Sequence, residues 1–432
     1  MKVVVLGAGV VGVSTAWFLA KAGHEVIVID RQAQAGIETS YANGGQISVS
    51  QSEPWANPGT PMRALKWMSK EDAPLLFRWR FDSRQWSWAL KFLTECRPGR
   101  AKQNIRQLLN LGLYSRRTLQ DLRAETGIHY DEQTRGILAI YQSQQALDEA
   151  ANTCLLMQTY GMDRKVVTRD QIVEIEPALR HIAPKLAGGT YCPSDESGDA
   201  RMFTQRLALL CEAEGVEFRY HTRINALLTR GSHLSGVSIT GSDGQYETLT
   251  ADAFVMAMGS YSPLLARTIG INLPIYPAKG YSATVPIEEP EVEVQNGEFV
   301  EGDNAPMVSI TDEENRLVFS RLGDRLRIAG TAEFNGYSTE LNAVRCTALI
   351  NRAKQLFPSG ADYSNAMFWT GLRPVTPSNV PMIGRTKEYN NLFLNTGHGA
   401  LGWTQGPGSG RALADIIING DRPEVDFRFM GL

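Results

Sequence analysis

The chain has 432 residues, of which 43% are hydrophobic, 21% charged and 9% aromatic. This composition is typical of a folded protein with two or three domains, and it excludes the collagen-like, coiled-coil and disordered classes. The 43 Lys and Arg against 46 Asp and Glu give a formal net charge of -3, which disfavours nucleic acid as a partner. The five cysteines never approach CxxC spacing, so we expect a cytoplasmic protein without a disulfide framework or a metal site.

The N-terminal segment predicts a nucleotide-binding βαβ unit. An uncharged run from Val3 to Ala20 has the hydropathy of a signal peptide or a marginal membrane span. However, the glycines of GxGxxG follow directly after the apolar VVVL, so the run divides into a strand, a tight turn and a buried helix. A second apolar run, VIVID, then predicts a parallel strand that ends at Asp30.

Each residue of this fingerprint has an expected role. Gly7 allows the tight turn, Gly9 lets a pyrophosphate approach the backbone, and Gly12 lets the helix pack on the strand. The helix N-terminus supplies partial positive charge to the phosphates. Asp30 is expected to accept hydrogen bonds from an adenosine ribose, which disfavours NADP. The fingerprint leaves NAD and FAD both open, and a glycine-rich turn without a ligand is the alternative.

Later segments extend the predicted cofactor site. ETSYANGGQIS at 38–48 can bring amides and small side chains against a diphosphate or a flavin ring. ADAFVMAMGS predicts a buried strand that ends in a glycine. GLRPVTPSNVPMIG and NLFLNTGHGALGWTQGPGSG lead into a C-terminal helix, where a second group of amides suits an anionic flavin or a diphosphate.

The motifs VVVLGAGVVGVSTAWFLA, ETSYANGGQIS, YPAKGYS, FWTGLRPVTPSNVPMIG and LNTGHGALGWT resemble, along almost the whole chain, the bacterial D-amino-acid dehydrogenases. These are FAD-dependent amine oxidoreductases related to D-amino-acid oxidase. The resemblance implies an α/β fold with a discontinuous, Rossmann-like FAD-binding domain and an α+β substrate-binding domain with an antiparallel sheet. We expect the FAD-binding domain at 1–52, 196–264 and 366–432, and the substrate-binding domain at 53–195 and 265–365.

The fingerprint and the resemblance together predict FAD as the cofactor and give its candidate contacts. These are Gly7, Gly9, Val10, Val11, Gly12, Asp30, Arg31, Ser40, Asn43, Gly44, Gln46, Ile224, Ala257, Gly259, Gly371, Gly397, Gly399, Gly402, Trp403 and Thr404.

Three residues are candidates for the catalytic site. Arg373 in GLRP is the expected anchor of the substrate carboxylate, because a guanidinium fork binds a carboxylate through two hydrogen bonds; the matching arginine has this role in the family. Tyr281 in KGYS is a second candidate, as a phenol that donates to the same carboxylate. The resemblance places His398 near the flavin. The alternatives are a structural ion pair for Arg373, a half-buried sheet aromatic for Tyr281 and a turn-shaping histidine for His398.

The resemblance implies oxidative deamination of D-amino acids to 2-oxo acids and ammonia. Hydride would pass from Cα to flavin N5, and the electrons would leave to a quinone or another respiratory acceptor. Two alternatives stay open: an oxygen-using oxidase of glycine, sarcosine or (hydroxy)proline-type amines, and an FAD-binding subunit of a multi-subunit dehydrogenase.

Residues 53–100 are rich in tryptophan. They hold five of the eight tryptophans among arginines, lysines and prolines: Trp55, Trp67, Trp79, Trp86 and Trp88. Aromatic rings mixed with cations are typical of a membrane interface, so peripheral contact with the inner membrane face is one interpretation. The alternative is a substrate cap with buried tryptophans and solvated arginines.

Overall fold

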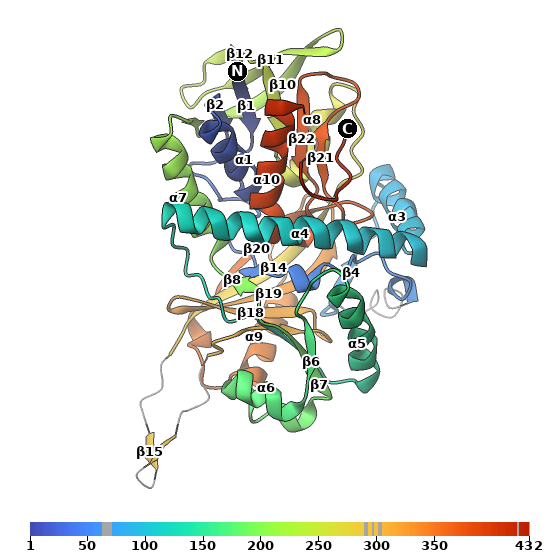
Figure 1. Cartoon of the computed structure of the whole chain (residues 1–432), viewed down its shortest axis with the longest axis vertical. Helices are drawn as coiled ribbons and strands as arrows, with labels where there is room; N and C mark the ends of the chain where they lie inside the picture. Colours follow the sequence, from blue (N-terminus) through green and yellow to red (C-terminus); the bar gives the residue numbers. More distant parts are fainter. Residues whose placement is uncertain (63–70, 289–292, 296–297, 301–304, 421–422, 432) are drawn as a thin grey trace.

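The computed structural model is built around two large sheets, with the long helix α4 (Pro98–Thr126) lying across the molecule between them (Figure 1). It describes residues 1–62, 71–288, 293–295, 298–300, 305–420 and 423–431.

The first sheet has six strands in the order β21-β22-β13-β1-β2-β9. Their bounds are Met382–Arg385, Leu392–Thr396, Ala253–Met256, Lys2–Leu6, Glu25–Ile29 and Glu217–Arg219. All neighbours are parallel except the edge strand β21. Helix α1 (Val10–Lys21) joins β1 to β2, so the predicted βαβ unit is confirmed.

Helices cover one face of this sheet and a small sheet covers the other. On the first face α1 packs against α7 (Ala200–Ala213) and α10 (Gly402–Asn419), and α4 packs on α10. On the second face lie α8 (Ser262–Arg267) and the antiparallel strands β10 (Arg223–Arg230), β11 (His233–Thr240) and β12 (Tyr246–Leu249). Successive residues of β1 therefore enter two different cores, as the strand period requires.

The second sheet has the strand order β20-β14-β19-β18-β17-β5-β7-β6, with β4 beside β19. Their bounds are Met367–Val375, Tyr276–Pro286, Arg325–Phe334, Leu317–Leu322, Ser309–Asp312, Ile137–Tyr141, Gly188–Cys192, Lys165–Val167 and Leu75–Phe77. Most neighbours are antiparallel, as predicted; β17–β5 and β19–β4 are parallel. Helices α6 (Arg169–Ile175) and α9 (Ala343–Leu356) contribute to the core of this sheet.

The remaining elements are α3 (Ser83–Glu95), α5 (Gln144–Gln158), the strand pair β3 (Gln46–Ile47) and β8 (Glu196–Ser197), and the hairpin of β15 (Glu293–Gln295) and β16 (Glu298–Val300).

The domain boundaries stay a prediction, and two elements bear on them. The predicted boundaries put strand β20 in the FAD-binding domain. However, β20 pairs with β14 along its whole length, with Val375 opposite Tyr276 at one end and Met367 opposite Thr284 at the other, so it belongs to the second sheet. Helix α4 was placed in the substrate-binding domain, but it packs on α10, which covers the first sheet.

Candidate active site

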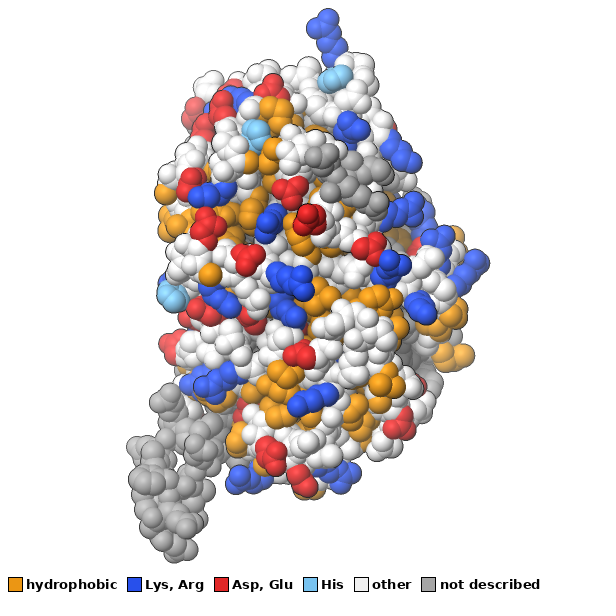
Figure 2. Space-filling model, in the orientation of Figure 1, with side chains coloured by type: hydrophobic (Ala, Val, Ile, Leu, Met, Phe, Trp, Pro, Cys, Tyr) orange, Lys and Arg blue, Asp and Glu red, His pale blue; other side chains and the backbone are white. Residues whose placement is uncertain are grey.

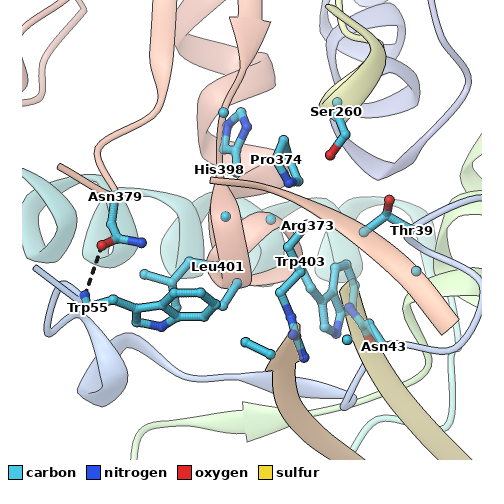
Figure 3. A pocket seen from close by; sticks show the side chains of 18 of the residues that line it. Thr39, Asn43, Trp55, Ser260, Arg373, Pro374, Asn379, His398, Leu401 and Trp403 are labelled. Carbon is cyan, nitrogen blue, oxygen red and sulfur yellow. Dashed lines mark hydrogen bonds between the residues drawn. The ribbon is translucent and has the colours of Figure 1, made fainter. Parts of the chain in front are cut away.

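A cavity of about 1740 Å³ joins the two sheets. At one end its wall includes Gly7, Asp30 and Gly259, which lie at or just beyond the carboxyl ends of β1, β2 and β13. At the other end it includes Thr331 of β19 and Arg373 of β20 (Figure 3). Ligands of open α/β sheets bind outside the carboxyl ends of the strands, and this volume exceeds that of an ordinary small-molecule pocket.

The three fingerprint glycines have distinct surroundings. Gly7 has φ +110°, and a Cβ there would lie 2.7 Å from the carbonyl oxygen of Ala257. A Cβ on Gly12 would lie 1.9 Å from the carbonyl oxygen of Gly7, so this glycine serves the packing of α1 against the turn and does not line the cavity. The nearest atom to a Cβ on Gly9 is the Ser40 Oγ at 3.7 Å, which leaves its backbone open to a ligand.

The N-terminus of α1 and Asp30 form the nucleotide end of the cavity. The amide of Val10, the first residue of α1, donates to the Ser40 Oγ (3.2 Å). No acidic residue lies in the first turn of α1, so the partial positive charge of the helix N-terminus is not neutralised. The Asp30 carboxylate accepts hydrogen bonds from the amides of Ala8 (2.7 Å) and Gln32 (2.9 Å), and burial raises its pKa. Each oxygen keeps a further lone pair that a ribose hydroxyl can use.

A second helix N-terminus, that of α10, lies beside the start of α1, where a Cβ on Gly406 would lie 3.3 Å from the Val10 side chain. Residues 397–403, from the end of β22 into the start of α10, all line it. Gly397 (φ +85°) and Gly399 (φ +56°) adopt the left-handed conformation that turns the chain into the helix. The first turn of α10 carries no acidic residue, so its amides suit an anionic flavin or a diphosphate.

Nearly all the predicted cofactor contacts line this cavity. Those that do are Gly7, Gly9, Val10, Val11, Asp30, Arg31, Ser40, Asn43, Gly44, Gln46, Ile224, Ala257, Gly259, Gly371, Gly397, Gly399, Gly402 and Trp403. The exceptions are Gly12 and Thr404; the Thr404 Oγ1 accepts a hydrogen bond from the amide of Ser48 (3.0 Å) and holds the 38–48 loop against α10. The assignment of individual FAD contacts stays a prediction, and the two helix N-termini, neither of which has an acidic residue in its first turn, fit the negatively charged groups of FAD.

Arg373 is a cation without a counter-ion. Its guanidinium donates from Nη1 to the carbonyl oxygen of Thr331 (2.7 Å), and no described carboxylate forms an ion pair with it. Burial, together with the nearby Arg345, lowers its pKa to about 10, so it remains charged at neutral pH. Most buried charges are paired; a cation on a cavity wall with no ion-pair partner among the described residues has the chemistry to bind an anion. The described part of the chain therefore gives no support to the structural ion-pair alternative.

Tyr281 stands in a buried polar cluster next to this site. Its hydroxyl donates to Glu333, whose other carboxylate contacts include Lys279 Nζ at 3.1 Å. Burial, and then the hydrogen bond to Glu333, raises the pKa of Tyr281. Because the hydroxyl is already bound, the geometry suits a role in the wall of the cavity better than direct contact with a carboxylate, and the catalytic role stays a prediction.

His398 lies in the cavity wall, and its backbone pairs with Val375 at the end of β20 (Figure 3). Its Nε2 is 3.1 Å from the Ser409 Oγ, and burial lowers its pKa to about 3. The imidazole is therefore neutral over the ordinary pH range. Its place near the flavin stays a prediction; the ring also ties the turn before α10 to that helix.

Three further residues of the cavity wall were not predicted from the sequence. Gly280 and Thr331 lie beside the guanidinium, and Asn379 accepts a hydrogen bond from the Trp55 amide (2.8 Å; Figure 3). Asn379 has φ +63°, which asparagine tolerates, so the SN pair in PVTPSNVP was a usable signal of a turn. The sequence gave no such signal at Thr331, because β-branched residues rarely adopt a positive φ and this residue has φ +54°.

The neutral state of His398 predicts a pH dependence of stability. Below the ordinary histidine pKa of 6.5, the unfolded chain binds a proton at this residue that the folded chain does not bind. The folded state should therefore lose up to about 1.4 kcal/mol per pH unit from this group as the pH falls from about 6.5. Urea unfolding with saturating FAD at pH 7, 6 and 5 should show a shallower loss for His398→Gln than for the native chain. The exposed His233→Gln is the control, and an equal pH dependence in all three proteins would contradict the prediction.

Comparisons with known proteins give the family to which the chain belongs. A family model described as "DAO: FAD dependent oxidoreductase" matches residues 2–416. A D-amino acid dehydrogenase of Dechloromonas aromatica (strain RCB) is 55% identical over 430 residues, covering 100% of both chains. One of Paramagnetospirillum magneticum is 51% identical over 418 residues, covering 96% of this chain and 95% of that protein. The crystal structure of glycine oxidase from Bacillus cereus shares the fold, with a TM-score of 0.70 at 23% identity over 98% of this chain and 96% of that one. The resemblance seen in the motifs is confirmed: the chain belongs to the DAO family of FAD dependent oxidoreductases.

Proposed function

We propose that this chain oxidises D-amino acids to 2-imino acids, which hydrolyse to 2-oxo acids and ammonia. The observation that carries the proposal is the Arg373 guanidinium, which forms no ion pair with a described carboxylate and lies on the wall of the cavity that also includes the nucleotide-binding unit. The relatives at 55% and 51% identity are named D-amino acid dehydrogenases, which supports the same substrate class.

The side chains of the cavity position the substrate for this reaction. When bound, FAD would supply the acceptor for the hydrogen that leaves Cα of the free amine with its electron pair. The nitrogen lone pair forms the C=N bond, and the resulting iminium releases a proton to solvent to give the 2-imino acid. Arg373 keeps N–H donors beyond the one given to Thr331, and these hold the substrate carboxylate through charge-assisted hydrogen bonds. Trp55 and Leu401 belong to the wall of the same cavity (Figure 3), where their apolar side chains would help to exclude water from a bound substrate. An anchored carboxylate fixes the position of Cα, which is the main contribution the chain can make.

The proposed electron acceptor is a quinone reached at a membrane surface. Among the described residues no helix could cross a bilayer, so the proposed contact is peripheral. It uses an apolar surface, here called the α3 surface, formed by Trp79 (56% exposed), Phe81, Trp86 (46%), Leu90 and Leu93. Trp79 and Trp86 stack with their centroids 4.8 Å apart.

Basic residues surround the α3 surface. Arg80, Arg84, Lys91, Arg97 and Arg100 are all exposed, and Figure 2 shows blue and orange side chains together at the edge where Figure 1 places α3. Cations around exposed aromatic and aliphatic side chains suit a bilayer with anionic lipid.

The other tryptophans of this segment differ in their surroundings. Trp88 is buried and donates from its indole to the Val375 carbonyl oxygen (2.8 Å), and Trp55 lines the cavity. Trp67 lies outside the described residues. Of the described tryptophans in this segment, only Trp79 and Trp86 therefore belong to the proposed membrane-binding surface. Trp88 fits the alternative interpretation, a substrate cap with buried tryptophans.

The proposed reaction has a direct test. Anaerobic addition of D-alanine or D-proline to the purified holoprotein should bleach the flavin absorbance, whereas the L-amino acids should not. In air and with a quinone present, the protein should oxidise the substrate while forming much less than one molecule of hydrogen peroxide per molecule of substrate. Stoichiometric peroxide would favour the oxygen-using oxidase, and no turnover of the single chain with an artificial dye would favour a subunit that needs a partner.

The anchor can be tested by Arg373→Lys. A lysine keeps the charge but cannot reproduce the two-pronged fork, so this variant should retain FAD and lose about a hundredfold in kcat/KM. The measurement is steady-state kinetics with D-alanine and D-proline, together with the FAD absorbance of the purified protein. Unchanged kinetics would remove Arg373 from the substrate site.

The α3 surface can be tested by liposome flotation. The native chain should float with vesicles that contain anionic phospholipid at low salt, and Trp79→Ser and Trp86→Ser should each reduce the floating fraction. The matched control is Tyr246→Ser, which removes an 82% exposed aromatic ring on β12, away from α3. No flotation of the native chain would end the membrane proposal.

A further inference from the structure

We propose that Gly280 and Thr331 are positioning residues that hold the Arg373 guanidinium in place for the substrate carboxylate. The inference rests on the proposed function, in which Arg373 anchors that carboxylate. It concerns the point where β20, β14 and β19 lie side by side in the second sheet.

The pairing of β14 with β19 is interrupted by a β-bulge at this point. Lys279 is opposite Glu333, and Tyr281 is opposite Gly330. Gly280 alone therefore faces two residues of β19, Thr331 and Ala332, and the register shifts there. Such bulges bend a strand and redirect its groups, and they are frequent next to active sites.

Thr331 occupies the bulge in a conformation that its side chain disfavours. Its φ is +54°, in the left-handed region where a β-branched residue is an outlier. Its Oγ1 is buried without a hydrogen-bond partner among the described residues. Two unfavourable features at one residue that lines the cavity suggest that the bulge is kept for the direction of its carbonyl group.

The Arg373 side chain reaches this carbonyl by crossing the strand between them. Arg373 is on β20, Thr331 is on β19, and β14 lies between the two strands. A Cβ on Gly280 would lie 2.4 Å from Nη1, 2.5 Å from Cζ and 2.6 Å from Nη2 of Arg373. The whole guanidinium therefore lies over the backbone of Gly280, in space that any other residue would fill.

The choice of a backbone carbonyl as the partner has an electrostatic consequence. A carboxylate in the same place would neutralise Arg373 and compete with the substrate. The Thr331 carbonyl oxygen accepts one N–H and fixes the plane of the fork, but the positive charge remains. The fork is thus held before the substrate arrives, and less rotational freedom is lost when the carboxylate binds.

The test is Gly280→Ala in the holoprotein, with pyruvate as a small carboxylate probe whose binding is followed by the change in flavin absorbance. The added methyl group should displace the guanidinium, weaken pyruvate binding about tenfold or more, and raise the KM for D-alanine more than it lowers kcat. The control is Gly236→Ala on β11, where a Cβ would lie 2.8 Å from the Leu249 carbonyl oxygen, outside the cavity. This control should leave pyruvate binding unchanged.

A double variant separates positioning from general damage. In the Arg373→Lys background, Gly280→Ala should cause no further loss of pyruvate affinity, because the group that it displaces is gone. If Gly280→Ala alone does not retain FAD, the double variant should, because the thinner lysine head removes the collision. A double variant that also loses FAD would overturn the inference, as would an unchanged pyruvate affinity in Gly280→Ala. Absence of D-amino acid oxidation by the native chain would overturn the proposed function instead.

Discussion

The site depends on keeping the half-buried Arg373 guanidinium charged and without an ion pair to the described carboxylates. Removing a lone cation from water is unfavourable, and an ion pair with a carboxylate of the same sheet, such as Glu333 two residues along the chain from Thr331, would lower this cost. That carboxylate is instead held by Tyr281 and Lys279, and these hydrogen bonds outweigh the effect of burial and keep the pKa of Glu333 below its ordinary value. The polar cluster beside the cavity thus leaves the charge of Arg373 for a ligand.

The strand that carries Arg373 is tied to the elements of the cofactor site. The carbonyl oxygen of Leu372, the residue before it, accepts hydrogen bonds from the hydroxyls of Thr39 (3.0 Å) and Ser260 (2.9 Å). Thr39 belongs to the 38–48 loop, and Ser260 follows the end of β13. At the other side of Arg373, Val375 pairs with His398. The distance between the anchor and the cofactor cleft is therefore set by backbone contacts on both sides, which suits a reaction that needs a fixed Cα.

Local signals carried most of the sequence prediction, and contacts between distant segments account for what it missed. The βαβ unit and the charge-bearing GLRP motif are encoded in short runs, so both could be read from the chain alone. The bulge could not, because it follows from the pairing of β14 with β19, and threonine opposes the conformation it adopts. The role of a glycine was also ambiguous in the sequence. Gly408 belongs to the C-terminal glycine-rich run that was predicted to bind the cofactor through its amides, but a Cβ there would lie 2.5 Å from the Ser115 Cα, so this glycine allows α10 to pack on α4.

Helix α3 connects the outer surface with the cavity. Trp88 and Phe92 line the cavity, while Trp86 and Leu90 are exposed on the same helix. Trp79 and Leu93 of the α3 surface also line the cavity. A membrane docked on the α3 surface would thus lie at the cavity wall, and a hydrophobic electron acceptor would reach this part of the protein without crossing water. The tryptophan-rich segment that the sequence offered as either a cap or a membrane surface has the geometry for both, because Trp88 is buried, Trp86 is exposed, and Trp79 is both exposed and part of the cavity wall.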